Sequence, residues 1–367
     1  MDESVRLPGH PATTRSYSHG RVNLIGEHTD YNGGFVLPTL IPQRTYVCIV
    51  PRHHDIVQAV SPDIDADRVA FELGKETRRH GWIDFVQGVT RTLRAAGHRL
   101  RGFDALISSE VPVGSGLSSS AALDVALLRG LREAFALKLD DLEIARLGQR
   151  VENEFVGAQV GIMDPMVCSL GREGFALFVD ARSLDYELIP MPADADLVVI
   201  NSGVAHRHSA GDYNARRAEC GRACKLLGVE QLRDLSERDL PRVASLPEPL
   251  DRRTRHVVTE NVRVLAAVTA MRANDLTLLG RLFNASHDSQ RDDYQVSIPE
   301  IDLLVNLARQ DDGVYGARLT GGGFGGSIVV LAHSGAGRQE ANRVKSEYDK
   351  RSGNTATILV PPDQPGG

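Results

Sequence analysis

The stretch VPVGSGLSSSAALDVA, residues 111–126, runs from a glycine turn into a helix. After Gly116, apolar residues recur at steps of three and four, the period of one helix face: Ala121, Val125, Leu128, Leu131 and Phe135. The first N–H groups of a helix lack intrahelical partners and lie at the positive end of its dipole. The stretch therefore predicts an anion site, with Gly114 and Gly116 leaving room for a phosphate. The alternative is a glycine turn with a serine N-cap.

Two common nucleotide signatures are absent from the sequence. The P-loop pattern G-x-x-x-x-G-K-[ST] does not occur, because Gly74-Lys75 is the only glycine–lysine pair and Glu76 follows it. The H-R-D and D-F-G motifs of protein kinases are also missing. If the loop binds phosphate, it does so in another class of enzyme.

A second glycine-rich loop, LTGGGFGGSIVV, spans residues 319–330 between two expected strands. Five of the six residues 321–326 are glycine, which is more than a hairpin needs. The excess indicates a backbone brought close to a ligand or to another loop. A loose turn is the alternative.

A third stretch, GRVNLIGEHTDYNGG, spans residues 20–34 and collects charged and polar side chains in a short space: Arg21, Glu27, His28 and Asp30. A buried strand does not carry such a set. Taken alone, the stretch fits a polar surface turn as well as a binding site.

The whole chain has the composition of a globular protein. Its 367 residues predict two domains, and 42% of them are hydrophobic and 25% charged. The net charge is -6 and no block of five like charges occurs, so we expect neither a nucleic-acid nor a membrane partner. No stretch approaches the roughly 18 apolar residues of a membrane span. Four cysteines without a C-x-x-C pair favour a reduced, cytoplasmic protein, and we expect a monomer.

Hydrophobic patterns predict a mixture of strands and helices. Strands are expected near 45–50, 102–108, 174–180, 196–201 and 326–332, and helices near 141–156, 214–227, 254–285 and 299–309. The two types follow one another without regular βαβ alternation, so the sequence predicts an α+β fold. We expect one domain over residues 1–187, a second over 188–360 and a tail over 361–367.

The three motifs, in this order, resemble those of the GHMP small-molecule kinases. Within that superfamily, GRVNLIGEHTDYNGGFVLP is similar to the galactokinase signature. Four further segments resemble galactokinase segments: WIDFVQGV at 82–89, GIMDPM at 161–166, RHVVTENVRV at 255–264 and RDDYQVSIPEID at 291–302. The resemblance covers nearly the whole chain. It implies an N-terminal domain like a ribosomal-protein fold and a C-terminal ferredoxin-like domain, with the active site between them.

The resemblance also implies a residue set for galactose, ATP and Mg²⁺. Five residues would bind the sugar: Glu27, His28, Asp30, Gly161 and Tyr213. Seven would wrap the ATP phosphates: Gly114, Ser115, Gly116, Leu117, Ser118, Ser119 and Ser120. Trp82 would lie near the adenine, and Ser120 and Glu152 would carry Mg²⁺. Asp164 would face the anomeric hydroxyl, with Arg21 at the reacting centre.

These residue types suit phosphoryl transfer, which needs positioning and charge stabilisation. Asp164 can accept the proton of the galactose O1 hydroxyl, and Arg21 can offset charge on the transferring group. Mg²⁺ prefers oxygen ligands and keeps several waters, so one serine and one glutamate suffice beside the phosphates. A site that hydrogen-bonds the C4 hydroxyl would reject glucose by leaving polar groups unpaired.

The sequence departs from the galactokinase pattern at two positions, and it leaves two alternative functions open. Pro165 stands where many galactokinases have glutamine, and Ser115 replaces a commoner alanine or glycine. One rival is a kinase of the same superfamily acting on N-acetylgalactosamine, arabinose or galacturonate. The other is a non-catalytic sensor that binds galactose, ATP and a transcriptional repressor. Such sensors have a damaged serine–alanine loop, whereas residues 118–122 are intact here.

Overall fold

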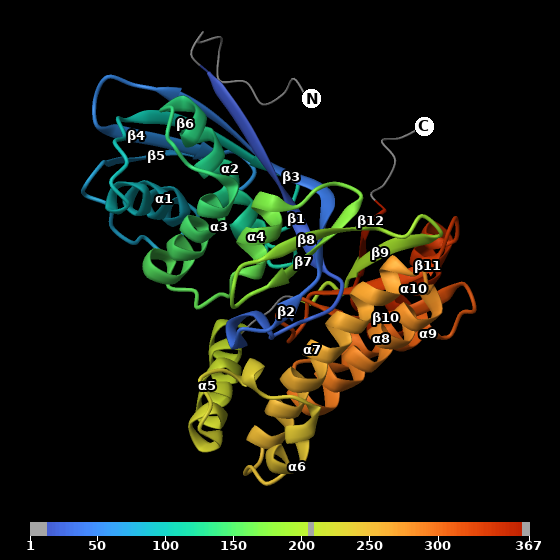
Figure 1. Cartoon of the computed structure of the whole chain (residues 1–367). Coiled ribbons are helices and arrows are strands. Elements are labelled where there is room, and N and C mark those ends of the chain that lie inside the picture. Colours follow the sequence, from blue (N-terminus) through green and yellow to red (C-terminus); the bar gives the residue numbers. More distant parts are fainter. Residues whose placement is uncertain (1–12, 205–208, 362–367) are drawn as a thin grey trace. The chain divides into compact units, whose positions relative to one another are not determined.

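The computed structural model describes residues 13–204 and 209–361, which form two compact units (Figure 1). The first unit contains the chain up to Arg21, Ile41–Val113 and Ser118–Leu170. The second contains Val22–Leu40, Gly114–Leu117 and the chain from Gly171 onward. The domain boundary expected near residue 187 stays a prediction, and the tail expected over 361–367 lies outside the described residues except for Pro361.

Strands in the first unit pair mainly around β3 and β6. Their bounds are β1 Thr14–Asn23, β3 Pro38–Pro51, β4 Ile56–Ser61, β5 Asp65–Glu72 and β6 Phe103–Ser109. β3 is antiparallel to β6, with Thr45 opposite Ser109. β4 runs parallel to β6 and antiparallel to β5, and β1 pairs with β3. The β3 side chains from Val47 to Val50 are all buried, so this part of the sheet is covered on both faces.

Helix α2 is the central helix of the first unit. The helices are α1 Ile83–Ala95, α2 Ser119–Ala134, α3 Asp141–Arg150 and α4 Met163–Leu170. α2 packs against each of the other three. Its side chains from Ala121 to Leu128 are all buried, so the predicted apolar face is wider than one stripe. α3 continues into a π-helical segment, Val151–Val156.

A four-stranded antiparallel sheet forms the base of the second unit. Its spatial order is β10, β11, β9 and β12, with bounds Val314–Thr320, Ser327–His333, Ala195–Asn201 and Thr357–Val360. Helices α8 Leu276–Ser289, α9 Pro299–Arg309 and α10 Gly337–Ser352 pack on it. α7 Leu250–Arg272 packs on α8, and α5 Ser209–Leu227 packs on α7. A smaller ladder joins β2 Phe35–Val36, β7 Phe175–Asp180 and β8 Tyr186–Pro190.

The predicted strands all occur, but one predicted helix is wrong. The structure divides the helix expected over 254–285 into α7 and α8. Asn274 has φ +53°, a left-handed conformation that asparagine tolerates better than most residues. The Asp275 side chain then accepts a hydrogen bond from the Leu278 N–H at 2.8 Å and caps α8. The apolar period alone does not reveal this break.

None of the helices in the described ranges is long and apolar enough to cross a membrane.

Candidate active site

The first unit brings Asp164 and Arg21 together, 143 positions apart in the sequence. Asp164 lies in the first turn of α4, and Arg21 lies near the end of β1. Arg21 Nε donates to Asp164 Oδ1 at 2.7 Å, and Nη2 donates to Oδ2 at 2.6 Å. This bidentate pair fixes the carboxylate plane. The Arg21 side chain is 5% exposed and that of Asp164 26%, so the acid is the more accessible partner.

Ser118, which follows the first glycine loop, contacts this pair. It precedes α2 with φ +59°, an uncommon left-handed conformation for a serine. Its Oγ donates a short hydrogen bond to Asp164 Oδ2 and caps no backbone group among the described residues. The serine N-cap considered as an alternative is therefore wrong. The first turn of α2 keeps the uncapped N–H groups that suit an anion.

Ser120 and Glu152 form the next contact in the same unit. Ser120 Oγ donates to Glu152 Oε1 at 3.1 Å. Glu152 lies in the π-helical segment after α3 and is 4% exposed. Burial, together with the negative charge of Asp164, raises the pKa of Glu152 to about 7, against the opposing effects of Ser120 and Arg21. We call these five residues the Asp164 cluster: Arg21, Ser118, Ser120, Glu152 and Asp164.

Ser120 and Glu152 fit the divalent cation that the sequence analysis expected. Both offer oxygen atoms, which Mg²⁺ prefers, and the two oxygens already touch. A bound cation would also stabilise the charged form of Glu152, which burial disfavours. Within the described residues, no group of three or more His, Cys, Asp or Glu is arranged to hold a metal. A cation held by Ser120 and Glu152 would therefore take its remaining ligands from other oxygen groups, such as water.

Sequence reasoning missed Asp124, which lies one turn after Ser120 on α2. Its side chain is fully buried, and neither carboxylate oxygen has a hydrogen-bond partner among the described residues. Burial and the nearby Glu152 raise the pKa of Asp124 well above its usual range. Asp124 lies four residues after the candidate ligand Ser120 and so shares its helix face. This spacing is the signal in the sequence that could have identified Asp124.

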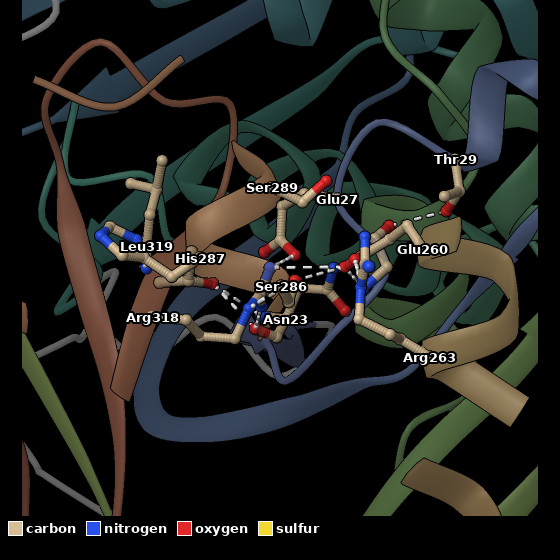
Figure 2. Close-up of polar contacts among 12 residues, drawn as sticks. Asn23, Glu27, Thr29, Glu260, Arg263, Ser286, His287, Ser289, Arg318 and Leu319 are labelled. Carbon is tan, nitrogen blue, oxygen red and sulfur yellow. Dashed lines mark hydrogen bonds and ion pairs between the residues drawn. The ribbon is translucent and has the colours of Figure 1, made fainter. Parts of the chain in front are cut away.

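In the second unit, Glu27 is the centre of a buried ionic network (Figure 2). Arg318 Nη2 donates a short bond to Glu27 Oε2, and the Gly321 N–H donates to Oε1 at 3.1 Å. Arg318 Nη1 also donates to the Leu24 carbonyl at 2.8 Å. Burial raises the pKa of Glu27, and the Arg318 guanidinium acts against this effect. Both Glu27 and Arg318 are almost fully enclosed.

Glu260, on α7, is the second carboxylate of that network. Its Oε1 accepts from Ser286 Oγ at 2.6 Å and from the Gly26 N–H at 2.9 Å. Arg263 Nε donates to its other oxygen at 2.7 Å. Burial alone would raise the pKa of Glu260, but Arg263, His256 and Arg318 together lower it to about 2. We call this group the Glu27 network: Glu27, Glu260, Arg263, Ser286 and Arg318.

The remaining residues of the third sequence motif lie beside aromatic rings of the same unit. His28 has φ +63°, and its ring centroid is 5.4 Å from that of Tyr213 on α5. Asp30 begins a short 3-10 helix and is partly exposed, with Oδ1 accepting from the Tyr31 N–H at 2.9 Å. Three residues predicted to bind sugar, His28, Asp30 and Tyr213, thus belong to one unit with Glu27.

The second glycine loop follows β10 and meets the first glycine loop within this unit. A Cβ atom on Gly321 would lie 3.1 Å from the Gly116 carbonyl oxygen, so a side chain would crowd the contact. Gly321 and Gly116 have φ of +84° and +78°, conformations that favour glycine. Ser327 Oγ donates to the Ser115 carbonyl at 2.8 Å. The predicted close approach to another loop is confirmed, and the loose turn is wrong.

The contacts described above do not include five predicted residues: Gly114, Gly161, Trp82, Leu117 and Ser119. Gly114 is exposed, with φ +75°. Gly161 is buried three positions before Asp164, and Trp82 is partly buried at the N-cap of α1. Leu117 is buried, whereas Ser119 is partly exposed in the first turn of α2. Their roles toward sugar and nucleotide stay predictions.

Comparison with known proteins identifies the family to which the chain belongs. Family models match the GHMP kinase N-terminal domain at residues 84–172 and the GHMP kinase C-terminal domain at residues 267–350. A third, the galactokinase galactose-binding signature, matches residues 9–51. A galactokinase from Roseiflexus sp. (strain RS-1) is 45% identical over 348 residues, covering 93% of this chain and 89% of the relative. The chain belongs to the galactokinase family.

Other members of the galactokinase family give the same result. A galactokinase from Chloroflexus aurantiacus is 46% identical over 330 residues, covering 88% of this chain and 85% of the relative. The structure of Lactococcus lactis galactokinase complexed with galactose matches with TM-score 0.90 and 35% identity, covering 94% of this chain and 92% of that one. Methanococcus jannaschii mevalonate kinase, at TM-score 0.69 and 18% identity, shares the fold. The predicted α+β, two-domain GHMP kinase fold is confirmed.

Proposed function

We propose that this galactokinase-family chain transfers the γ-phosphoryl group of ATP to O1 of α-D-galactose, giving galactose 1-phosphate and ADP. The observation that carries the proposal is Asp164, a carboxylate held by Arg21 on one side and by Ser118 of the phosphate loop on the other. An acid fixed beside a phosphate loop is what a sugar hydroxyl needs to attack phosphorus.

Asp164 would accept the O1 proton as the oxygen attacks. Arg21 holds the carboxylate through two hydrogen bonds, which leaves little freedom for the acid to turn away. A guanidinium keeps its charge throughout the working pH range, so Arg21 also offsets negative charge that develops on the transferring group. The left-handed Ser118 places its hydroxyl on the acid and leaves the α2 N–H groups for the phosphates.

Ser120 and Glu152 would hold Mg²⁺ through oxygen atoms. The ion, when bound, supplies positive charge that offsets the charge of the ATP phosphates. Glu152 comes from a π-helical segment, a local irregularity that often marks functional sites. Gly114 and Gly116 would let the loop backbone approach the phosphates, together with Ser115, Leu117 and Ser119. Trp82 would lie near the adenine.

Glu27, His28, Asp30, Gly161 and Tyr213 would bind the sugar. Glu27 accepts from Arg318 and Gly321, yet each carboxylate oxygen has two lone-pair sites, so it can also accept from a sugar hydroxyl. The galactose named in the Lactococcus lactis complex supports this sugar. We propose further that the reaction is the first step of galactose catabolism, carried out in the cytoplasm by a monomer.

The first experiment measures ADP release with ATP and Mg²⁺ against five sugars: galactose, glucose, N-acetylgalactosamine, arabinose and galacturonate. We expect turnover on galactose to exceed that on glucose by orders of magnitude, because a polar pocket rejects the wrong C4 epimer. A preference for another sugar of the panel would keep the phosphoryl transfer and overturn the substrate. Binding of galactose and ATP without turnover would indicate a sensor.

The raised pKa of Glu152 predicts that the Mg²⁺ requirement depends on pH. The pKa of Glu152 is about 7 without a cation, so protons compete with Mg²⁺ below that pH. The Mg²⁺ concentration for half-maximal rate should rise as pH falls through 7, by up to about tenfold per pH unit for one proton. It should level off above pH 7, where the carboxylate is already ionised. Rates at a series of Mg²⁺ concentrations and constant ATP would measure this.

Glu154 provides a matched control in the same π-helical segment. Its side chain is 59% exposed and pairs with Arg150 at 3.0 Å. Glu154→Gln should keep the pH-dependent Mg²⁺ requirement, whereas Glu152→Gln should raise the requirement at pH 7 and above and make it nearly independent of pH. A Glu152→Gln enzyme with the original pH dependence would exclude Glu152 as the titrating ligand.

A further inference from the structure

A row of hydrogen-bonded side chains extends from His28 Nδ1 in the second unit. Tyr31 Oη is 2.9 Å from His28 Nδ1 and 2.7 Å from Tyr294 Oη. Tyr294 Oη is 3.1 Å from Cys220 Sγ. At the far end, Asn32 Nδ2 donates to Cys220 Sγ at 3.6 Å. We call these five residues the His28 row.

The row is enclosed and comes from separate elements. Tyr294 ends the π-helical segment Gln290–Tyr294, Cys220 lies on α5, and both are at most 1% exposed. The Tyr294 ring centroid lies 4.7 Å from that of His28. His28 itself is 5% exposed and is held at φ +63°. A strained conformation of this kind persists only where its surroundings fix it, and it concentrates at functional sites.

The hydrogen bonds of the row can run in one of two directions. Each tyrosine hydroxyl has one proton, so the hydroxyls must all donate toward His28 or all donate toward Cys220. A neutral imidazole nitrogen, whose conjugate acid has a pKa of about 6.5, is a far better acceptor than a phenol oxygen. In the arrangement that this difference favours, Tyr31 donates to His28 Nδ1 and Tyr294 donates to Tyr31.

The far end of the row agrees with this direction. The Asn32 amide nitrogen donates to the His28 carbonyl at 2.8 Å, which fixes the orientation of the amide. The same nitrogen donates to Cys220 Sγ. The sulfur thus accepts from Asn32, and its own S–H is free to donate to Tyr294. The two tyrosine hydroxyls, the thiol and the Asn32 amide then each have an acceptor.

We propose that Tyr31 and Tyr294 are positioning residues that hold His28 as the neutral tautomer with its hydrogen on Nε2. His28 would then donate a hydrogen bond to a sugar oxygen and would not accept one. The inference rests on the proposed function, because it specifies how the sugar site of that reaction is prepared.

The surroundings of His28 Nε2 support the proposal. Nε2 is buried and has no partner in hydrogen-bond geometry among the described residues. Burial lowers the pKa of His28 to about 3, helped by His256 and Arg216 and opposed by the Gly322 backbone and Glu260. The ring is therefore neutral at any working pH. The Gly322 backbone interacts with the ring, but Nε2 has no acceptor in hydrogen-bond geometry, so an incoming sugar oxygen would give its hydrogen a better-placed acceptor.

The test combines nitrogen NMR with steady-state kinetics on the full-length protein. The chain has 12 histidines, and His28→Gln identifies the His28 signals by their loss from a sample labelled with ¹⁵N-histidine. We expect wild-type His28 to show a protonated Nε2 and a bare Nδ1. Tyr31→Phe removes the donor to Nδ1, so the ring should become a mixture of tautomers. The galactose KM should rise roughly tenfold, the effect of one hydrogen bond, with kcat changed by less than about twofold.

Tyr348→Phe is the matched control. Tyr348 is a buried tyrosine of the same unit whose Oη donates to the Ser202 carbonyl at 2.9 Å. Its loss should lower the melting temperature without changing the galactose KM or the His28 tautomer. Tyr294→Phe should act in the same direction as Tyr31→Phe but more weakly, because Tyr31 can still donate to Nδ1. If Tyr294→Phe does not fold, Tyr31→Phe, whose ring is only partly buried, decides the question.

Three results separate this proposal from the proposed function. A wild-type NMR signal with the hydrogen on Nδ1 would contradict the proposed tautomer of His28, whatever the enzyme activity. An unchanged tautomer and KM in Tyr31→Phe would overturn it as well. A wild-type enzyme that used none of the tested sugars would overturn the proposed function, and the NMR signals would still decide the tautomer.

Discussion

Asp164→Asn is expected to lower kcat by about 10²- to 10⁴-fold, the usual contribution of a general base. Asparagine keeps the size of the side chain and one acceptor oxygen, but it cannot take the O1 proton. Galactose binding should change far less than kcat, because no other sugar ligand is altered. ADP release at saturating galactose and ATP measures the effect, and a direct galactose titration separates chemistry from binding.

Asp104→Asn is the matched control for that experiment. Asp104 lies on β6 in the same unit and pairs with Arg52, with Arg52 Nε 3.1 Å from Asp104 Oδ2. The change removes one carboxylate from an arginine pair, as Asp164→Asn does, but outside the Asp164 cluster. Its kcat should stay within about twofold of the wild type, as for a substitution away from such a site. An Asp164→Asn enzyme with near-wild-type kcat would show that Asp164 does not act as the base.

Arg318→Met is expected to lower the free energy of unfolding by about 3–5 kcal/mol, the range found when one partner of a buried ion pair is removed. Arg318 is fully buried and contacts Glu27 directly, with Glu260 Oε1 at 3.8 Å. Without it, Glu27 loses the one cation that contacts it among the described residues, although Glu260 retains Arg263. Urea unfolding curves would measure the change.

Arg272→Met is the comparison on the surface of the second unit. Arg272 pairs with Glu187 at 2.6 Å, and both side chains are more than half exposed. Its removal should cost less than about 1 kcal/mol. Adding Glu27→Gln to Arg318→Met should recover part of the lost stability, because it removes the unpaired charge. If Arg272→Met and Arg318→Met cost the same, the Glu27 network does not stabilise the fold as described.

The sequence predicted those parts of the fold that depend on local pattern. The helix after Gly116, the strands near 45–50 and 326–332 and the close approach of the two glycine loops all occur. Each depends on apolar period or on an excess of glycine within a short window. The strand β1 was not expected, because its residues 14–23 mix charged and polar side chains with few apolar ones. Its pairing with β3 decides its conformation, and propensity alone does not.

The candidate site was predictable as a set of residues but not as a set of contacts. Asp164, Arg21 and Glu152 came from resemblance, and the structure supplies the bidentate pair and the raised pKa of Glu152. Ser118 was expected to bind phosphate or cap a helix, and its bond to Asp164 was not foreseen. Arg318 lies 291 positions from Glu27, and no local pattern joins them.

The division of the chain has a practical consequence. The sequence passes from one unit to the other after Arg21, Leu40, Val113, Leu117 and Leu170. A gene fragment that begins at Gly171 would therefore encode most of the second unit but lack Glu27 and His28. A fragment that ends at Leu170 would encode the first unit together with two segments of the second unit, Val22–Leu40 and Gly114–Leu117. Neither half can be cloned as one intact unit, so an attempt to split this enzyme for complementation must cut within a unit.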